Sequence, residues 1–306
     1  MAEQAQVEQQ ARCGFAALVG APNVGKSTLI NALVGAKVSI VTPKVQTTRA
    51  LVRGIAIVNG AQLIFVDTPG IFSPRRRLDR AMVDTALGST RDADLVAVVI
   101  DSRRGIGDDD ERILAALADL RAPRVLVLNK IDLVDKTVLL GLARKLNESA
   151  NFAVTFMISA LSGDGVADLK HWLAEHVPAG PWLYPEDQIS DAPLRQLAAE
   201  ITREKLYLRL HQELPYQSTV ETEVWKELKD GSVRIEQTVY VARESQRKIV
   251  LGKGGQTIKA IGAAARAEIA AAIEQPVHLF LHVKVRDGWM DDPERYRAIG
   301  LEFPKE

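Results

Sequence analysis

The stretch GAPNVGKS, from Gly20 to Ser27, closes the apolar run FAALVG and opens onto STLINALVG, which has the apolar spacing of a helix. A glycine-containing loop between a strand and a helix surrounds phosphate oxygens with backbone N–H groups, and the helix N-terminus adds partial positive charge. Lys26 is expected to reach the β- and γ-phosphates of a nucleotide, and Ser27 to give its hydroxyl to Mg²⁺. The predicted contacts of this loop with the nucleotide are Asn23, Val24, Gly25, Lys26, Ser27 and Thr28.

Short apolar runs alternate with helical segments from Phe15 to about Val177. The runs are FAALVG, LVRGIAIV, QLIFVD, DLVAVVID, RVLVLN and AVTFMIS. This alternation predicts a doubly wound α/β domain with a mostly parallel sheet. The second and third runs are separated only by the turn NGA, so we expect a hairpin there and one antiparallel edge strand.

The string DTPG, from Asp67 to Gly70, begins at the last residue of the apolar run QLIFVD. Asp67 ends the predicted strand, which aims its carboxylate at the metal through a water molecule. The backbone N–H of Gly70 is expected to contact the γ-phosphate and to sense whether this group is present. The predicted metal-site residues are Ser27, Thr48 and Asp67.

The polar segment PKVQTTR, from Pro43 to Arg49, is predicted to be a first switch segment. One of its threonines should complete the Mg²⁺ shell when GTP is bound, and we favour Thr48 while Thr47 remains the alternative. A second switch is expected from Ile71 to about Thr90. The residues predicted to act on the transferred phosphoryl group are Lys26, Thr48 and Gly70.

The string NKID follows the apolar run RVLVL, and SAL follows AVTFMI. Both therefore lie at carboxyl ends of predicted strands, where ligands of α/β proteins bind. The carboxylate of Asp132 matches the two donors of guanine, N1–H and the 2-amino group, and adenine would leave this carboxylate unpaired. The nucleotide is therefore predicted to be GTP or GDP. The predicted contacts of this part are Asn129, Lys130, Asp132, Ser159, Ala160 and Leu161.

A proline-rich break, VPAGPWLYPED, separates this pattern from a second one. Beyond it come a helix, two strands, a helix, the turn GKGG, a helix and a strand, which is the element order of a type II KH domain, an α+β RNA-binding fold. The chain is thus predicted to contain a disordered N-terminal tail over 1–12, a GTPase domain over 13–178, a linker over 179–190 and a KH domain over 191–306.

The net charge of the whole chain is zero, which conceals a local surplus in the second domain. Between Tyr240 and Asp287 there are eight Lys and Arg residues against four Asp and Glu residues. Glycines allow a nucleic-acid backbone to approach the GKGG turn, and cations beside it neutralise phosphates. The predicted RNA contacts are Arg247, Lys248, Ile249, Gly252, Lys253, Gly254, Gly255 and Lys259.

Composition limits the remaining function classes. The single cysteine, Cys13, excludes an internal disulfide framework and fits a reducing compartment. The polar, acidic N-terminus does not have the pattern of a signal peptide. No apolar stretch approaches the roughly 18 residues that a membrane helix needs. The histidines show no ligand spacing, so we propose no metal site beyond Mg²⁺.

The order GAPNVGKS, QTTR, DTPG, NKID, SAL and GKGG resembles the Era family of bacterial ribosome-assembly GTPases over nearly the whole chain. The resemblance implies a Ras-like GTPase domain joined to a KH domain that binds the 3′ end of 16S rRNA in the small (30S) ribosomal subunit. It implies that the GTP or GDP state times this association. It also implies a cytoplasmic protein with peripheral association at the inner face of the cell membrane. Nothing in the sequence indicates more than a monomer.

Two residues bear on the rate of hydrolysis. Ile71 follows DTPG, where Ras-like switches carry a glutamine that orients the attacking water, so we expect unaided hydrolysis to be slow. Asn23 resembles the asparagine of potassium-activated GTPases, so K⁺ stimulation is a hypothesis. Two alternatives stay open: a nucleotide-gated RNA-binding module in which hydrolysis is incidental, and a related GTPase of tRNA modification.

Overall fold

A computed structural model describes residues 11–74, 76–211, 213–288, 292–298 and 300–304 of the chain. The first ten residues, which make up most of the predicted tail, lie outside the described residues. The first strand already includes Arg12, the last residue of that predicted tail. None of the helices in the described ranges is both long enough and apolar enough to cross a membrane.

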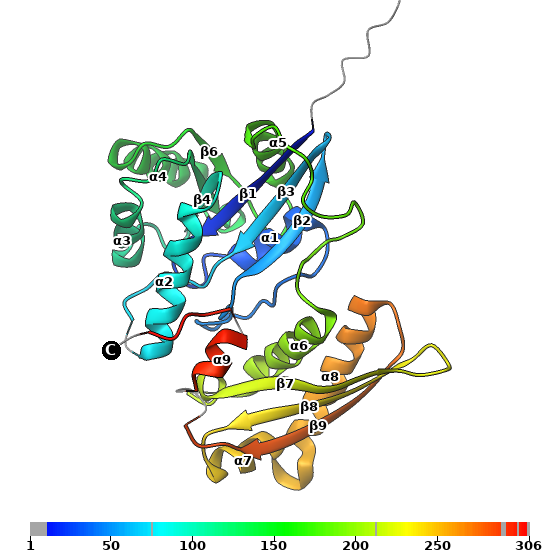
Figure 1. The fold of residues 1–306 in the computed structure, drawn as a ribbon. Helices are drawn as coiled ribbons and strands as arrows, with labels where there is room; N and C mark the ends of the chain where they lie inside the picture. The colour runs from blue at the N-terminus through cyan, green and yellow to red at the C-terminus, as the bar shows by residue number, and fades with distance from the viewer. Residues whose placement is uncertain (1–10, 75, 212, 289–291, 299, 305–306) are drawn as a thin grey trace, which may run out of the picture.

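The first half of the chain forms a six-stranded sheet in the order β2-β3-β1-β4-β5-β6 (Figure 1). The strands are β1 Arg12–Val19, β2 Val52–Val58, β3 Ala61–Asp67, β4 Leu95–Asp101, β5 Arg124–Asn129 and β6 Val154–Met157. Strand β2 at the edge pairs antiparallel with β3, and the other neighbours pair parallel. The α/β class, the mostly parallel sheet and the hairpin are thus confirmed. The strands read as continuous apolar runs because parallel sheets are covered on both faces.

Helices cover the two faces of this sheet. Their bounds are α1 Lys26–Val34, α2 Arg77–Arg91, α3 Asp108–Ala116, α4 Lys136–Ser149 and α5 Val166–His176, with a short 3₁₀ helix η1 at Ile131–Leu133. Helices α1 and α5 pack against each other and against β2 and β3, whereas α2 contacts β1. One large apolar cluster fills the space between the sheet and the helices, and it extends from Ala16 to Val177 along the chain.

The second half forms a three-stranded sheet in the order β7-β8-β9, with β7 antiparallel and β9 parallel to β8. Helices α6, α7 and α8 pack on it (Figure 1). The elements are α6 Leu194–Arg209, η2 Pro215–Gln217, β7 Ser218–Glu227, β8 Val233–Val241, α7 Glu244–Leu251, η3 Lys253–Gly255, α8 Gln256–Ile273, β9 Val277–Val285 and α9 Pro293–Ala298. The predicted KH order is therefore confirmed, and α9 is an element that the sequence pattern did not indicate.

The segment between the two halves is tied to the first sheet. The side chain of Gln62 on β3 accepts from the backbone N–H of Leu183, at 2.8 Å, and donates to the carbonyl oxygen of Tyr184, at 2.7 Å. Further on, the hydroxyl of Ser190 donates to the carbonyl oxygen of Arg53, at 2.8 Å. The chain therefore runs along the β2–β3 side of the first sheet before it enters α6 (Figure 1).

The C-terminal segment returns to the first half and packs on α2. Tyr296 of α9 and Leu301 form a buried apolar cluster with Leu78, Ala81 and Met82 of α2. Figure 1 shows α9 and the C-terminus beside α2. The expected second switch is thus covered by residues from the far end of the chain.

A third contact between the halves joins the segment 37–49 to α6. The backbone N–H of Val41 donates to Oε1 of Glu204, at 2.8 Å, and the ammonium of Lys37 pairs with the same carboxylate, at 2.7 Å. The carbonyl oxygen of Thr47 accepts from the guanidinium of Arg203. The segment 37–49, which includes the first switch segment, is therefore held by α6 through both backbone and side-chain atoms.

Arg49 ends this segment and is almost completely buried, with 6% of its surface exposed. Its guanidinium donates to the hydroxyl of Tyr207, at 2.7 Å, and to the carbonyl oxygens of Ser218, at 3.0 Å, and Tyr216, at 3.0 Å. A buried guanidinium needs such acceptors because it has lost its water. Here all of these acceptors come from the second half of the chain.

Two glycine substitutions should have opposite effects on stability. A Cβ at Gly54 in β2 would lie 2.7 Å from the Val34 side chain and 3.1 Å from that of Val38, so Gly54→Ala overpacks the core. It should lower the free energy of unfolding by about 1–3 kcal/mol. Gly141 is exposed within α4 and has open space around it, so Gly141→Ala should raise stability by about 0.5–1 kcal/mol. Urea denaturation of both variants measures this, and equal midpoints would contradict it.

Candidate functional site

The phosphate loop lies between β1 and α1, and two of its glycines are required by close contacts. A Cβ at Gly20 would lie 2.4 Å from the carbonyl oxygen of Val99. Gly25 has a positive φ of 100°, and a Cβ there would lie 2.3 Å from Nδ2 of Asn129. Gly20 is thus required by the lack of space for a Cβ, and Gly25 by both the lack of space and the left-handed backbone, so the loop conformation is built into the sequence.

Lys26 points into this loop. Its side chain is buried, and Nζ donates to the carbonyl oxygens of Gly20, at 3.0 Å, and Ala21, at 3.1 Å. Burial lowers the pKa of Lys26 to about 8, although the charge of Asp67 opposes this shift. Carbonyl dipoles replace water only partly around an ammonium, so phosphate oxygens bound in the loop would stabilise its charged form.

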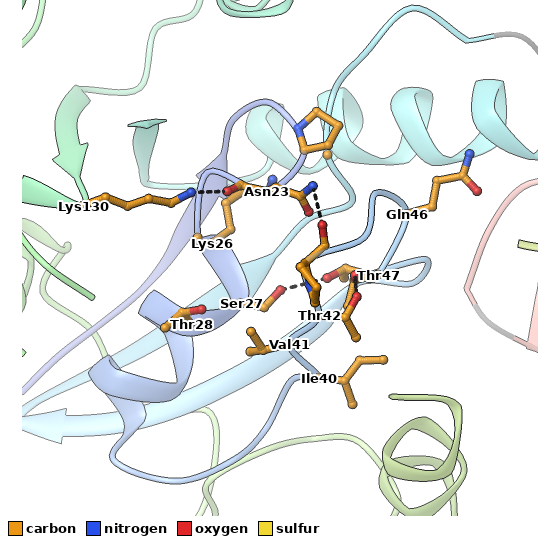
Figure 2. Close-up of a pocket in the computed structure, with 15 residues that line it drawn as sticks. Asn23, Lys26, Ser27, Thr28, Ile40, Val41, Thr42, Gln46, Thr47 and Lys130 are labelled. Atoms are coloured by element: carbon orange, nitrogen blue, oxygen red, sulfur yellow. Dashed lines mark hydrogen bonds between the residues drawn. The ribbon is translucent and has the colours of Figure 1, made fainter. Parts of the chain in front are cut away.

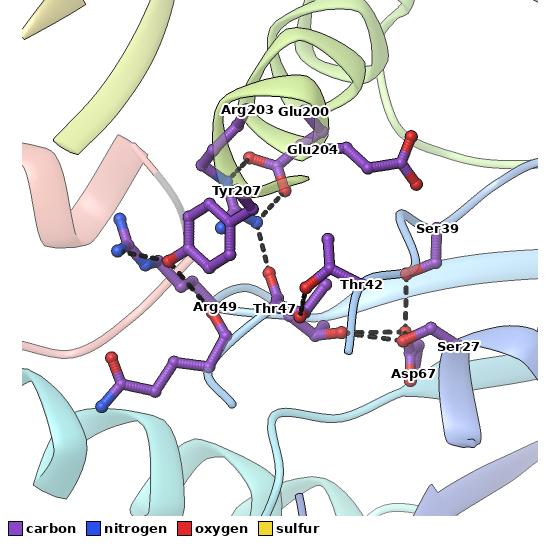
Figure 3. A network of polar contacts seen from close by, with 12 residues as sticks. Ser27, Ser39, Thr42, Thr47, Arg49, Asp67, Glu200, Arg203, Glu204 and Tyr207 are labelled. Carbon is purple, nitrogen blue, oxygen red and sulfur yellow. Dashed lines mark hydrogen bonds and ion pairs between the residues drawn. The ribbon is translucent and has the colours of Figure 1, made fainter. Parts of the chain in front are cut away.

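A cluster of oxygen atoms lies next to the loop, around the carboxylate of Asp67 (Figure 3). The hydroxyls of Ser27 and Ser39 each donate to Oδ2, at 2.7 Å, and that of Thr48 donates at 3.3 Å. Ser27 and Thr48 are also 2.9 Å from each other. Burial raises the pKa of the Asp67 carboxyl, and the bonds from Ser39 and Ser27 partly offset this.

The donor set of this cluster fits Mg²⁺. Hydroxyl and carboxylate oxygens are the ligands that this hard cation prefers. Within the described part of the chain, Oδ1 of Asp67 is buried and has no hydrogen-bond partner, so one carboxylate oxygen is available. Of the two candidate threonines, Thr48 has its hydroxyl in the cluster. The hydroxyl of Thr47 instead bonds Thr42, at 2.6 Å, and the carbonyl oxygen of Lys44, at 2.7 Å.

Ser39 was not among the residues that the sequence indicated. It lies in the run KVSIV, where alternating apolar residues favour a strand, and no motif spacing relates it to Asp67. Only the folded chain brings it to the cluster.

Residues of the phosphate loop and of the first switch segment line a cavity of about 410 Å³ (Figure 2). Its lining residues are Pro22, Asn23, Gly25, Lys26, Ser27, Thr28, Ile40, Val41, Thr42, Pro43, Gln46, Thr47, Thr48, Gly70 and Lys130. The amide of Asn23 donates across its rim to the carbonyl oxygen of Pro43, at 3.1 Å. The cavity therefore contains the predicted contacts of the loop except Val24, which is buried, whereas Asp132 and Ser159 to Leu161 do not line it.

Asn129 connects the phosphate loop to the predicted base contacts. Its Nδ2 donates to the carbonyl oxygen of Val24, at 2.8 Å, and its Oδ1 accepts from the backbone N–H of Ala160, at 3.0 Å. Lys130 donates to the carbonyl oxygen of Asn23, at 2.7 Å, and pairs with Asp101, at 2.6 Å. The NKID string is thus joined to the loop by direct hydrogen bonds, and the SAL string is joined to it through Asn129.

Asp132 lies on the short 3₁₀ helix η1, and its side chain is exposed. Ser159 is buried, and its hydroxyl accepts from the backbone N–H of Ser162, at 3.2 Å. Leu161 is 84% exposed. The Asp132 carboxylate is thus open to a ligand.

Gly70 and Ile71 lie against the phosphate loop. A Cβ at Gly70 would lie 3.0 Å from Pro22, and the backbone N–H of Ile71 donates to the carbonyl oxygen of Gly20, at 3.2 Å. The side chain of Ile71 is buried in the large apolar cluster. It therefore has neither the chemistry nor the direction to orient an attacking water.

The second predicted site is the turn between α7 and α8. Gly252, Gly254 and Gly255 all have positive φ angles, of 72°, 60° and 77°. A Cβ at Gly252 would lie 2.2 Å from Oγ1 of Thr257, whereas Gly254 and Gly255 have open space around them. The first glycine therefore closes the turn, and the other two leave its surface free for an approaching backbone.

A groove of about 320 Å³ lies beside this turn, between α8 and β9. Its lining residues are Ile258, Lys259, Gly262, Ala263, Arg266, Leu279 and Leu281. The last two were missed, although the alternation in HLFLHVKV places them on one face of β9. Val250, which follows the predicted contact Ile249, is fully buried in the core.

The other predicted RNA contacts differ in exposure. Lys248, Ile249, Lys253 and Lys259 are exposed. Arg247 is half-buried, donates to the carbonyl oxygen of Val283, at 3.1 Å, and pairs with a carboxylate of α7. Its guanidinium therefore also fixes α7 to β9.

Comparison with known sequences finds matches for both halves. Residues 15–130 match the family described as 50S ribosome-binding GTPase, and residues 213–290 match the KH domain family. The chain is 67% identical to the GTPase Era of Afipia carboxidovorans over 302 residues, which is 98% of each chain. It is 68% identical to the GTPase Era of Bradyrhizobium diazoefficiens over 295 residues, which is 96% of each chain.

Two solved structures are similar to the whole molecule. One is Era in complex with MgGDPNP and nucleotides 1506–1542 of 16S ribosomal RNA, with a TM-score of 0.90 and 38% identity over 95% of this chain and 99% of the other. The second is a variant of Aquifex aeolicus Era bound to GDP and AlF₄⁻. Its TM-score is 0.90, with 39% identity over 94% of this chain and 99% of the other.

The exposed carboxylate of Asp132 should control the choice of base. In Asp132→Asn the two acceptor oxygens facing guanine become one acceptor and one donor, so GTP affinity should fall by about 100-fold or more. Xanthosine triphosphate, which carries an oxygen in place of the 2-amino group, should bind better than GTP to this variant. Asp135→Asn, three residues further on at the start of α4, is the matched control and should bind GTP like the unmodified chain. Equal GTP affinity of both variants would contradict the assignment.

Proposed function

Since the chain belongs to the Era family of GTPases, we propose that it is an RNA-binding assembly factor of the small (30S) ribosomal subunit. It hydrolyses GTP to GDP and phosphate, and it binds the 3′ end of 16S rRNA, with the GTP or GDP state timing the association. The observation that supports this most strongly is the full-length likeness to Era captured with MgGDPNP and a 16S rRNA segment. That likeness includes both the phosphate loop and the glycine turn.

We propose that residues 13–178 form the GTPase domain, 179–190 the linker and 191–306 the KH domain. The separate apolar clusters support this division, since the large one ends at Val177 and two others begin at Ala198 and Ala199. The C-terminal residues that pack on α2 belong to the second domain by sequence and to the first by contact.

In hydrolysis, Lys26 and the backbone N–H groups of the loop would hold the β- and γ-phosphates, and the Gly70 N–H would contact the γ-phosphate. Ser27, Thr48 and Asp67 would hold Mg²⁺, which neutralises charge on the phosphates when it is bound. Because Ile71 is buried and apolar, this chain supplies no water-orienting side chain at that position, and unaided hydrolysis is slow.

For RNA, the groove between α8 and β9 offers an apolar floor to unstacked bases, with Leu279 and Leu281 on the strand side. Lys259 and Arg266 lie along the helix side and would neutralise phosphates. We propose further that the protein acts as a monomer in the cytoplasm and associates peripherally with the cell membrane. The family resemblance supports these two points.

The state of the nucleotide should control RNA binding. A short single-stranded RNA that copies the 3′ end of 16S rRNA should bind more tightly with a non-hydrolysable GTP analogue than with GDP at fixed salt. The double variant Gly254→Asp/Gly255→Asp places two negative charges at the open face of the turn, in a left-handed conformation that Asp tolerates. Its affinity for the RNA should fall by at least about tenfold, measured by fluorescence anisotropy.

Gly231→Asp is the matched control for this variant. Gly231 also has a positive φ and open space around it, but it lies in the turn between β7 and β8. It should bind RNA like the unmodified chain. Equal RNA affinity of the double variant and the control would remove the glycine turn from the RNA site. Equal affinity with GDP and the analogue would show two uncoupled domains.

We propose that K⁺ stimulates hydrolysis. The support is Asn23, whose backbone is left-handed and whose side chain reaches the first switch segment across the phosphate cavity. Hydrolysis should be faster in KCl than in NaCl at the same ionic strength, and Asn23→Ala should lose the difference. Single-turnover rates measure this, and equal rates in both salts would contradict it.

A further inference from the structure

Three hydroxyls converge on Oδ2 of Asp67, and they differ in what else they do. Ser27 is the second residue of α1, and Thr48 lies in the first switch segment. Both are proposed metal ligands. Ser39 is 3% exposed, and Asp67 is the described acceptor of its hydroxyl, at 2.7 Å. Its bond to Asp67 therefore needs no metal and no nucleotide.

The position of Ser39 is fixed by Asn31 of α1. Oδ1 of Asn31 accepts from the backbone N–H groups of Ser39 and Val38, each at 2.9 Å. Its Nδ2 donates to the carbonyl oxygen of Ser39, at 2.8 Å. One amide thus satisfies both backbone groups of Ser39 and holds it to α1, the helix that also carries Ser27. Such a bond network orients a ligand before the metal arrives.

We propose that Ser39 is a positioning residue of the metal site, which holds the Asp67 carboxylate in place for Mg²⁺ through its hydroxyl. This inference rests on the proposed Mg²⁺ site. Figure 3 shows Ser39 above the Asp67 carboxylate, to which a dashed line joins it. Without the Ser39 hydroxyl, a fully buried carboxylate loses one of its donors and can turn away from the metal.

The test measures how Mg²⁺ slows the release of a fluorescent GDP analogue from the full chain. In Ser39→Ala the Mg²⁺ concentration for half-maximal slowing should rise at least about tenfold. Release in excess EDTA should stay the same, because Ser39 does not line the phosphate cavity. Ser39→Thr keeps the hydroxyl and should restore the Mg²⁺ dependence.

Ser102→Ala is the matched control. Ser102 is also 3% exposed in the first domain, and its hydroxyl has no hydrogen-bond partner among the described residues. Its Mg²⁺ dependence should equal that of the unmodified chain. The proposal is wrong if Ser39→Ala shows the Mg²⁺ dependence of the unmodified chain. It is also wrong if the variant changes the rate of release equally with Mg²⁺ and in EDTA.

A fourth variant, Ser27→Ala, separates this proposal from the one it rests on. If Ser27→Ala weakens the Mg²⁺ dependence and Ser39→Ala does not, the positioning role alone is wrong. If Ser27→Ala also leaves it unchanged, the metal site itself is wrongly assigned, and both proposals fall.

Discussion

A carboxylate with no exposed surface lies at the end of β3, and the hydroxyls that replace its water come from three parts of the chain. A buried charge without such donors is costly, so the Asp67 cluster constrains where those parts can lie. It fixes the start of α1, the position of Ser39 and the path of the first switch segment to Thr48. The positions of the phosphate loop, the cavity and the proposed metal site all depend on these contacts with Asp67.

The segment 37–49, which includes Ser39 and Thr48, also makes the contact with the second domain. Its backbone is held by Glu204 at Val41 and by Arg203 at Thr47, while Arg49 is surrounded by acceptors from the other domain. Thr48, whose hydroxyl meets Asp67, thus lies between two residues that are bound to the second domain. A displacement of Thr48 at the metal site would alter those neighbouring contacts directly, because no free chain separates them. This gives the proposed coupling of nucleotide state and RNA binding a short physical route.

Local sequence signals indicated the folds of both domains and the order of their elements apart from α9, and they placed the nucleotide motifs in the loops that follow the strands. Gly20 of the phosphate loop and Gly252 of the GKGG turn leave no room for a Cβ. The choice between Thr47 and Thr48 was left open because both hydroxyls occur in one polar run. Gln46 just before them has a left-handed backbone, with φ of 56°, and the directions of the two side chains depend on how the chain turns there.

What the sequence did not indicate depends on partners that are distant along the chain. Glu204 lies in a helical pattern where a glutamate is normally solvated, yet it is 3% exposed because Lys37 and the Val41 N–H meet it. Ser39 and α9 were missed for the same reason. The position of Ser39 is set by its bond to Asp67, and α9 is held by its packing on α2. The type of a residue indicates only how exposed such residues are on average. A charged side chain or a hydroxyl is buried only where the fold supplies hydrogen-bond or ion-pair partners for it. The contacts that join the proposed metal site to the proposed RNA-binding domain are therefore the part of this molecule that the local sequence pattern predicts least well.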